Sequence, residues 1–147
     1  PAADGTDGFF IARLRAPSRA ALTIGDAIMD QRAIAGVGNI WKHETLFHCG
    51  INPWRTVGSL DDETLRALIA KARELLRASV GKPGPDGVVP RRPTMWVYAR
   101  PGHPGRRCSP RLRMNRQGMD IRYTTWCPKC QPIVEGQPMP PEGPRRR

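Results

Sequence analysis

The stretch GKPGPDGVVPRRPTM, residues 81–95, constrains the fold of this 147-residue chain more than any other segment. Proline and glycine disfavour the interior of a helix or strand, so regular structure is not expected to continue through this stretch. We interpret it as a linker or exposed loop that separates two parts of different character. Residues 1–80 carry 10 Lys and Arg against 9 Asp and Glu, whereas residues 81–147 carry 14 against 4.

The formal net charge of +11 indicates a polyanionic partner, and nearly all of the excess lies after the linker. Hydrophobic residues make up 39% of the chain, which allows one modest core or two small ones. The four unequally spaced cysteines, with no signal-like segment and no long apolar run, predict a reduced intracellular protein outside the membrane. No basic amphipathic helix favours an anionic lipid surface.

The first part of the chain has the patterns of a helical domain, which we place at residues 23–80. Residues 1–22 show no clear hydrophobic period and are interpreted as a lead-in. Thr23, followed three residues later by Asp26, resembles a capping box and predicts a short helix of about two to three turns.

Two further helices are expected before the linker. One begins near Asn39 and ends at a glycine cap, Gly50. The other is opened by Ser59 and Asp62 and buries an apolar stripe with helical spacing. The stripe consists of Leu65, Leu68, Ile69, Ala72, Leu75 and Leu76.

The part after the linker has the patterns of short strands. MWVYAR, residues 95–100, resembles a strand, and RLRMN and IRYTTW, residues 111–115 and 121–126, predict a hairpin around Gly118. Residues 132–147 hold five prolines and a terminal arginine run, and we expect them to be disordered.

The segment AGVGN, residues 35–39, precedes the second predicted helix and is the first candidate site. Exposed amides at a helix N-terminus bind anions, glycines let a phosphate approach closely, and Asn39 adds a neutral donor. Alternatively, the glycines form a tight turn and Asn39 caps the helix. The spacing alone leaves both interpretations open.

Three cysteines form the second candidate site. Cys108 and Cys127 are separated by eighteen residues, and Cys127 and Cys130 by two, which fits the second half of a C-x2-C-x15–20-C-x2-C zinc site. A hairpin as small as residues 96–131 has too little core to be stable without such a cross-link.

The fourth zinc ligand is not evident in the sequence. Position 105, where the pattern requires a cysteine, is Gly105. His103 is the nitrogen ligand nearby, so a set of three cysteines and His103 is one alternative; three cysteines with water, and no metal at all, are the others. Cys49 follows apolar residues on a predicted helix and is interpreted as a buried core thiol.

The run TIGDAIMDQRAIAGVGNIWKHETLFHCGINP, residues 23–53, resembles the helix-two-turn-helix segment of the formamidopyrimidine-DNA glycosylase/endonuclease VIII family. WVYARPGHPGRRC, followed by IRYTTWCPKCQ, resembles the zinc-finger hairpin of that family. The Gln-Arg pair in DQRAIAG and the VYAR sequence resemble the endonuclease VIII side, particularly actinobacterial forms. The implied fold is mainly α, a helix-two-turn-helix domain followed by a small β-hairpin zinc finger. The β-sandwich domain that precedes them in the family is expected to be absent from this chain.

The resemblance implies the DNA-binding half of a base-excision-repair DNA glycosylase and abasic-site lyase. Such an enzyme flips a damaged, typically oxidised, base out of double-stranded DNA, removes it through a Schiff base and nicks the backbone. It implies zinc as cofactor and, as partner of a monomer in the bacterial cytoplasm and nucleoid, duplex DNA with damaged bases or abasic sites. Asn39 and Lys42 would contact phosphate. Arg122 would clamp the same phosphate region and donate a proton in the second elimination step.

The chain also departs from the family. The catalytic amine of the family is an N-terminal proline followed by Glu and Gly, but Pro1 is followed by Ala2 and Ala3. We therefore expect Pro1 to mark a truncation, and we expect the chain alone to bind DNA weakly and to cleave nothing. Two alternatives are a stand-alone zinc-containing nucleic-acid-binding module without catalysis and a helical protein-interaction domain. The second would leave the basic half unused.

Overall fold

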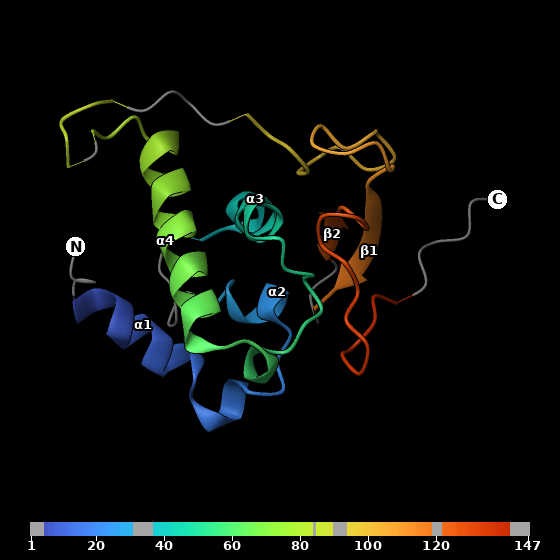
Figure 1. The fold of residues 1–147 in the computed structure, drawn as a ribbon, viewed down its shortest axis with the longest axis horizontal. Coiled ribbons are helices and arrows are strands. Elements are labelled where there is room, and N and C mark those ends of the chain that lie inside the picture. The colour runs from blue at the N-terminus through green and yellow to red at the C-terminus, as the bar shows by residue number, and fades with distance from the viewer. Residues whose placement is uncertain (1–4, 31–36, 84, 90–93, 119–121, 142–147) are drawn as a thin grey trace.

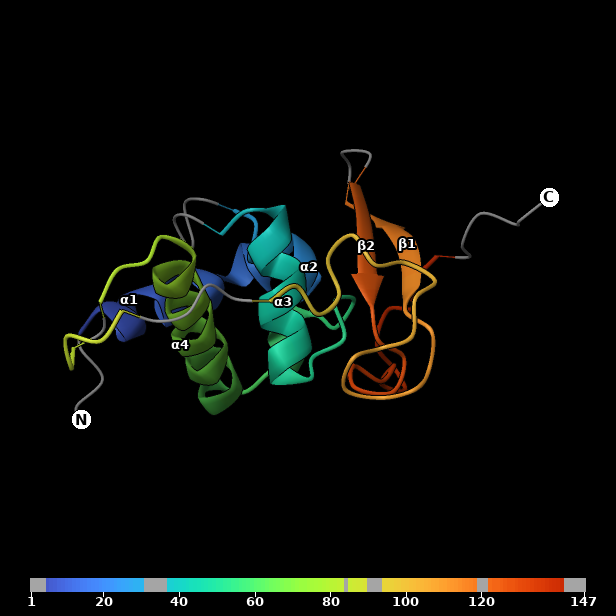
Figure 2. The ribbon, with the colours of Figure 1, turned by 90° about the horizontal axis from the view of Figure 1, so that it is seen from above.

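The computed structural model describes residues 5–30, 37–83, 85–89, 94–118 and 122–141 (Figure 1). Seen from above, the elements form a succession of layers (Figure 2). Helices α1 (Gly5–Leu14) and α4 (Asp62–Ser79) pack together at one end, and α3 (Asn39–Cys49) lies between α4 and the hairpin. The strands β1 (Arg113–Gln117) and β2 (Arg122–Trp126) form the other end. The hairpin therefore contacts the helical part directly through α3.

Helix α4, Asp62–Ser79, is the amphipathic helix that the sequence predicts. Its buried face includes Leu65, Leu68, Ile69, Ala72 and Leu75. The cap differs from the prediction: Asp61, not Ser59, accepts the bond from the backbone N–H of Thr64, at 2.7 Å. Ser59 is instead the last residue of a short 3₁₀ turn, Val57–Ser59, and its hydroxyl donates to the carbonyl of Thr56.

Residues 1–22, which the sequence analysis interprets as a lead-in, contain a helix that the sequence did not predict, α1, Gly5–Leu14. Ile11 and Leu14 are buried in the helical core, and α1 packs against α4. Arg15, just beyond the helix, pairs with Asp62 at 2.8 Å. Because Gly5 and Gly8 interrupt its apolar pattern, the segment does not show a clear helical period in the sequence.

Helix α2, Ile24–Ala27, is capped by Thr23, whose hydroxyl accepts from the backbone N–H of Asp26, as the sequence predicts. The described helix is shorter than expected, and residues 31–36, which include Ala35 and Gly36 of AGVGN, lie outside the described part of the chain. Helix α3, Asn39–Cys49, has the predicted bounds. It ends at Gly50 in the left-handed conformation, φ 68°, which suits glycine.

The predicted hairpin is confirmed. Strands β1, Arg113–Gln117, and β2, Arg122–Trp126, are antiparallel, and the register pairs Arg113 with Trp126 and Gln117 with Arg122. A small core joins the hairpin unit to α3 through four buried side chains, those of Phe47, Val97, Leu112 and Cys127.

The predicted strand at residues 95–100 is wrong. Residues 96–98 form a turn, and their three backbone N–H groups donate to the carboxylate of Glu44 on α3. The Glu44 carboxylate thus accepts the hydrogen bonds that a neighbouring strand would otherwise accept. In the described part of the linker, 81–83, 85–89, 94 and 95, there is no helix or strand.

The expected disorder of residues 132–147 does not hold for residues 132–141, which the structure describes. The side-chain oxygen of Gln137 accepts from both the N–H and the hydroxyl of Thr56, each at 3.0 Å. The carbonyl of Pro141 accepts from the amide of Asn115. Among the described residues, no helix combines the length and apolar character needed to cross a membrane.

Candidate functional site

A pocket of about 280 Å³ lies at the junction between the helical part and the turn end of the hairpin. Its walls come from α2 and the residues after it, from α3, and from the facing ends of β1 and β2. Acidic and basic side chains both reach it. The lining residues are Asp26, Met29, Asp30, Lys42, Gln117, Gly118 and Arg122.

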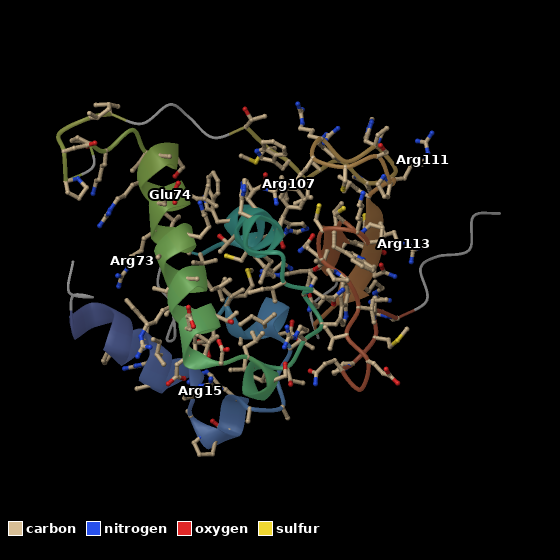
Figure 3. All side chains as sticks on the ribbon, viewed as in Figure 1. Arg15, Arg73, Glu74, Arg107, Arg111 and Arg113 are labelled. Atoms are coloured by element: carbon tan, nitrogen blue, oxygen red, sulfur yellow. The ribbon has the colours of Figure 1, made fainter. Side chains whose placement is uncertain are left out.

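Arg122 is the first residue of β2 and is exposed at this junction. The sequence resemblance assigns it the phosphate clamp, and the structure places it on the pocket together with Lys42. Arg111 and Arg113 lie on the same hairpin half of the molecule, whereas Arg15 and Arg73 lie on the opposite, helical half (Figure 3). Arg113 pairs with Trp126, at the end of the strands away from Arg122, so these arginines belong to the hairpin half but do not surround the pocket.

Lys42 is more deeply buried than a simple phosphate contact would be, with only 2% of its surface exposed. Its Nζ donates to the hydroxyl of Thr124 on β2 at 2.9 Å. Burial lowers the pKa of Lys42 to about 8; the carboxylate of Asp26 opposes this shift, and the nearby Arg122 guanidinium adds to it. Its assignment to phosphate stays a prediction, since the structure gives the ammonium a protein partner.

The bond from Lys42 continues through a buried network that the sequence did not reveal. The Thr124 hydroxyl donates to Gln117 Oε1 at 2.8 Å, and Gln117 Nε2 donates to Pro53 O at 2.8 Å and to Thr23 Oγ1 at 3.1 Å. Gly25 permits this close approach, because a Cβ there would stand 2.4 Å from the Gln117 amide. The network therefore joins α2, α3 and both strands.

His43 forms a second bridge between α3 and the hairpin. Its Nδ1 lies 2.6 Å from the carbonyl oxygen of Asn39, and its Nε2 lies 3.0 Å from the backbone nitrogen of Thr125. A carbonyl only accepts and an amide N–H only donates, so His43 is neutral and carries its proton on Nδ1. Burial lowers the pKa of His43 to about 4, which matches this neutral state. The edge of the ring meets Tyr98 at a centroid distance of 5.2 Å.

Asn39 is the first residue of α3, and its carbonyl is the one that His43 binds. The alternative in which Asn39 caps the helix is wrong, since the N-cap is Gly38 and no side chain caps this end. In the described part of the chain, the Asn39 side-chain Oδ1 is buried without a hydrogen-bond partner. Asn39 and Arg122 thus belong to two elements that His43 and Lys42 hold together.

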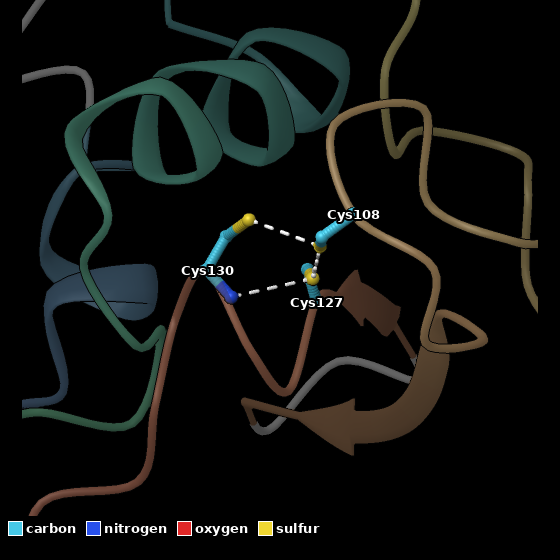
Figure 4. Close-up of side chains that lie close together, drawn as sticks. All are labelled: Cys108, Cys127 and Cys130. Atoms are coloured by element: carbon cyan, nitrogen blue, oxygen red, sulfur yellow. Dashed lines mark hydrogen bonds between the residues drawn. The ribbon is translucent and has the colours of Figure 1, made fainter.

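The predicted cysteine cluster is present. Cys108 Sγ lies 3.1 Å from Cys127 Sγ and 3.2 Å from Cys130 Sγ, and all three sulfurs lie within 4.8 Å of one another (Figure 4). His103, by contrast, is exposed and is not part of this group. Three thiols of this kind suit a soft or borderline metal ion such as zinc, and they supply three of the four ligands that tetrahedral zinc takes.

Cys49, the fourth cysteine, lies apart from that cluster. It is half-buried against the helical core, with its Sγ 4.0 Å from the carbonyl of Ala67 on α4. Burial raises the pKa of the Cys49 thiol to about 11, so it stays protonated and unreactive at neutral pH. This agrees with the predicted packing role.

Gln131, which sequence reasoning missed, connects the cysteine loop to the helical part. Its side chain accepts from the N–H of Cys127 at 2.9 Å and donates to the carbonyl of Ile51 at 3.0 Å. Its own carbonyl accepts from the Asn52 amide at 3.0 Å. The only indication of this role in the sequence is that a glutamine directly follows Cys130 in CPKCQ.

Known proteins resemble this chain in sequence and in fold. The family model described as Formamidopyrimidine-DNA glycosylase H2TH domain matches residues 6–86, more than half of the chain. A probable endonuclease 8 2 of Streptomyces coelicolor is 38% identical over 110 residues, which cover 74% of this chain and 40% of that protein. A formamidopyrimidine-DNA glycosylase of Methylococcus capsulatus is 36% identical over 136 residues, covering 85% and 48%.

A solved structure agrees with the sequence relatives. The MutM (Fpg) protein of Thermus thermophilus superposes with a TM-score of 0.69 at 30% identity, covering 85% of this chain and 49% of that one. The chain spans about 40% to 50% of the length of these relatives. The helix-two-turn-helix match, the curated relatives and the solved structure agree, and the chain belongs to the formamidopyrimidine-DNA glycosylase/endonuclease VIII family.

Proposed function

We propose that this chain is the DNA-binding C-terminal part of a base-excision DNA glycosylase and abasic-site lyase. The observation that carries the proposal is the junction at which α3 and the hairpin meet. There the buried bridges of Lys42 and His43 hold Asn39 and Arg122 in a fixed relation. Two polar groups from separate elements, one of them in the strongly basic part of the chain after residue 80, suit the backbone of a nucleic acid.

The proposed partner is double-stranded DNA that contains a damaged base or an abasic site, bound by a single copy of the chain. Relatives carry names that fit this partner, including a DNA-(apurinic or apyrimidinic site) lyase Nei2 of Mycolicibacterium smegmatis, 37% identical over 110 residues. A structure of Lactococcus lactis Fpg with abasic-site DNA has the same fold as this chain, with a TM-score of 0.69 at 22% identity. The charge of +11 supports an electrostatic contribution to the affinity.

In this proposal the described residues supply binding and positioning. Arg122 holds the phosphate beside the lesion, where a guanidinium binds in a bidentate manner, and it serves as the candidate proton donor of the second elimination step. Asn39 donates from its side-chain amide to the same phosphate region, since its Oδ1 faces the protein interior. Lys42 adds positive charge to the pocket wall. None of the described residues is assigned as the amine that forms the Schiff base.

Zinc has a place in the proposal as a structural ion. Cys108, Cys127 and Cys130 would hold it and would thereby tie the loop before β1 to the loop after β2. The ion contributes cross-linking free energy to a hairpin with a core of a few side chains. The hairpin unit, residues 96–131, and the helical unit, residues 23–80, are proposed as the two parts that the linker joins.

Fluorescence anisotropy with labelled duplexes tests the proposal. The chain is titrated into a duplex with a central tetrahydrofuran abasic analogue and into the same duplex without it, at two salt concentrations. We expect tighter binding to the analogue, weaker binding at higher salt, and loss of the preference in Asn39→Ala and Arg122→Ala.

Arg66→Ala is the matched control. Arg66 is an exposed arginine on α4, at the end of the molecule away from the hairpin, so its replacement removes the same charge without touching the junction. We expect Arg66→Ala to keep the preference for the abasic analogue. Equal affinity of the unmodified chain for both duplexes would refute the proposal and would favour a nucleic-acid-binding module without lesion recognition.

A further inference from the structure

The cysteine cluster offers a metal three ligands on one side and no side-chain donor on the other. Cys127 is buried, whereas Cys108 and Cys130 are partly exposed, so the cluster is open toward solvent at one side. The grouping of His, Cys, Asp and Glu ligand atoms in the described part of the chain contains these three thiols and no fourth member. His103 is exposed outside it.

Gly105 lies where a fourth ligand would have to begin. A Cβ built on Gly105 would stand 3.5 Å from Cys108 Sγ, so the missing side-chain direction of Gly105 points toward the cluster. The same Cβ would come within 2.6 Å of the Cys108 carbonyl oxygen, so a residue with a side chain at this position requires the loop to shift. The backbone thus approaches the metal position without contributing a donor atom.

We propose that the cluster binds one zinc ion through three thiolates and leaves its fourth coordination position, beside Gly105, open to an exchangeable ligand from solvent. Loading releases three thiol protons, because each cysteine binds as a thiolate, and the three-thiolate zinc centre carries one net negative charge. In the resting protein the fourth ligand is water. A small thiolate or imidazole replaces that water reversibly, since none of the other described His, Cys, Asp or Glu side chains competes for the position.

The surroundings are suited to such a centre. Arg106 and Lys129 are exposed and directly adjacent in sequence to Gly105 and Cys130, so two cations accompany the negative centre. Arg107 is held elsewhere, with its guanidinium 4.5 Å from the centre of the Phe47 ring. A structural zinc site with four protein ligands is closed to added ligands, whereas an open position is what distinguishes reactive zinc sites.

Cobalt(II) substitution tests this inference independently of DNA binding. The chain is loaded with cobalt under anaerobic conditions, freed of excess metal, and examined for the metal-to-protein ratio and for thiolate charge-transfer and d–d absorption. Imidazole and a small thiol are then titrated in. We expect one cobalt per chain and a saturable shift of the d–d bands on addition of either ligand.

Three variants locate the open position. Gly105→Cys is expected to abolish the shift by supplying a fourth thiolate, and Gly105→Ala, which introduces the same Cβ without a donor, is expected to retain it. His103→Ala should respond as the unmodified chain does. Should either glycine variant fail to fold, the unmodified chain and His103→Ala still decide the question.

Two results would overturn the inference. One is failure of the unmodified chain to retain cobalt. The other is a cobalt spectrum that added ligands do not move, because that would show a fourth protein ligand already in place. If the His103→Ala variant gained a shift that the unmodified chain lacked, His103 would be that ligand.

Discussion

His43 makes the docking of the hairpin on α3 sensitive to acid. Its two nitrogens bind Asn39 O and the N–H of Thr125 only when the ring is neutral. A proton on Nε2 would place an N–H against another N–H and abolish the second bond. Acidification is therefore expected to destabilise the folded chain over a pH range that His43 sets.

The magnitude follows from the pKa of His43, which burial lowers from about 6.5 in the unfolded chain to about 4. A lowered pKa means that the unfolded state takes up the proton first, so the stabilisation is fully present above about pH 6.5 and is lost as the pH falls toward 4. At about 1.4 kcal/mol per pH unit, the loss between pH 7.5 and pH 5 is about 2 kcal/mol.

Urea denaturation at the two pH values, followed by tryptophan fluorescence, to which the buried Trp126 on β2 contributes, measures this loss. Other groups titrate over the same range, so the quantity of interest is a difference between proteins. His43→Gln keeps a donor and an acceptor but does not titrate, and it should lose about 2 kcal/mol less than the unmodified chain on acidification. His48→Gln, on the same helix but half-exposed, serves as the control and should retain most of the acid sensitivity. Equal losses in the unmodified chain and His43→Gln would refute the reasoning.

Three further substitutions have expected effects on the free energy of unfolding, measured in urea. Glu44→Gln replaces one of the two accepting oxygens by an NH₂ group that faces the backbone N–H donors of residues 96–98. The free energy of unfolding is expected to fall by about 2 kcal/mol, and proteolysis after the linker is expected to become faster. Gly50→Ala, at φ 68° and with a Cβ 3.3 Å from a carbonyl oxygen, should lose more than the roughly 1 kcal/mol expected for Gly81→Ala, at φ 66° with nothing within 4 Å. Lys42→Met removes a buried ammonium and should raise the stability at pH 7 by about 1–2 kcal/mol, although Thr124 loses a donor. The unfolded state binds the Lys42 proton more tightly, so this gain should shrink as the pH rises from 8 to 10; a constant gain would contradict the lowered pKa of Lys42.

The elements with strong local signals could be predicted from the sequence. The stripe of α4 repeats over about three turns, from Leu65 to Leu76. Gly50, directly after Cys49, is typical of a helix C-terminus, and the segments on each side of Gly118 had enough strand character to predict the hairpin. Cys108 and the CPKC sequence were sufficient to predict the cluster. In each of these cases the chain segment itself contains the information.

The remaining features depend on partners that are distant in sequence. The turn at residues 96–98 has the composition of a strand, but its N–H groups bind Glu44, more than fifty residues earlier. The resemblance implies Lys42 as a phosphate contact, and only the tertiary structure shows its bond to Thr124, eighty-two residues later. Interactions of this kind determine the geometry of the junction where the candidate site lies. The sequence and its family resemblance could therefore name Asn39, Lys42 and Arg122, but not the contacts that position them.

Because contacts outside the linker hold the hairpin against the helical part, the linker has little influence on the orientation of the hairpin. Lys42, His43 and Gln131 form hydrogen bonds between the helical part and the hairpin unit, and none of the three belongs to residues 81–95. The linker then determines only the effective concentration of the hairpin unit near the helical unit. This concentration falls slowly as a flexible linker is lengthened. Insertions in residues 81–95 are therefore expected to be tolerated among relatives. A single substitution of Lys42, His43 or Gln131, by contrast, is expected to change the orientation of Arg122 toward its ligand.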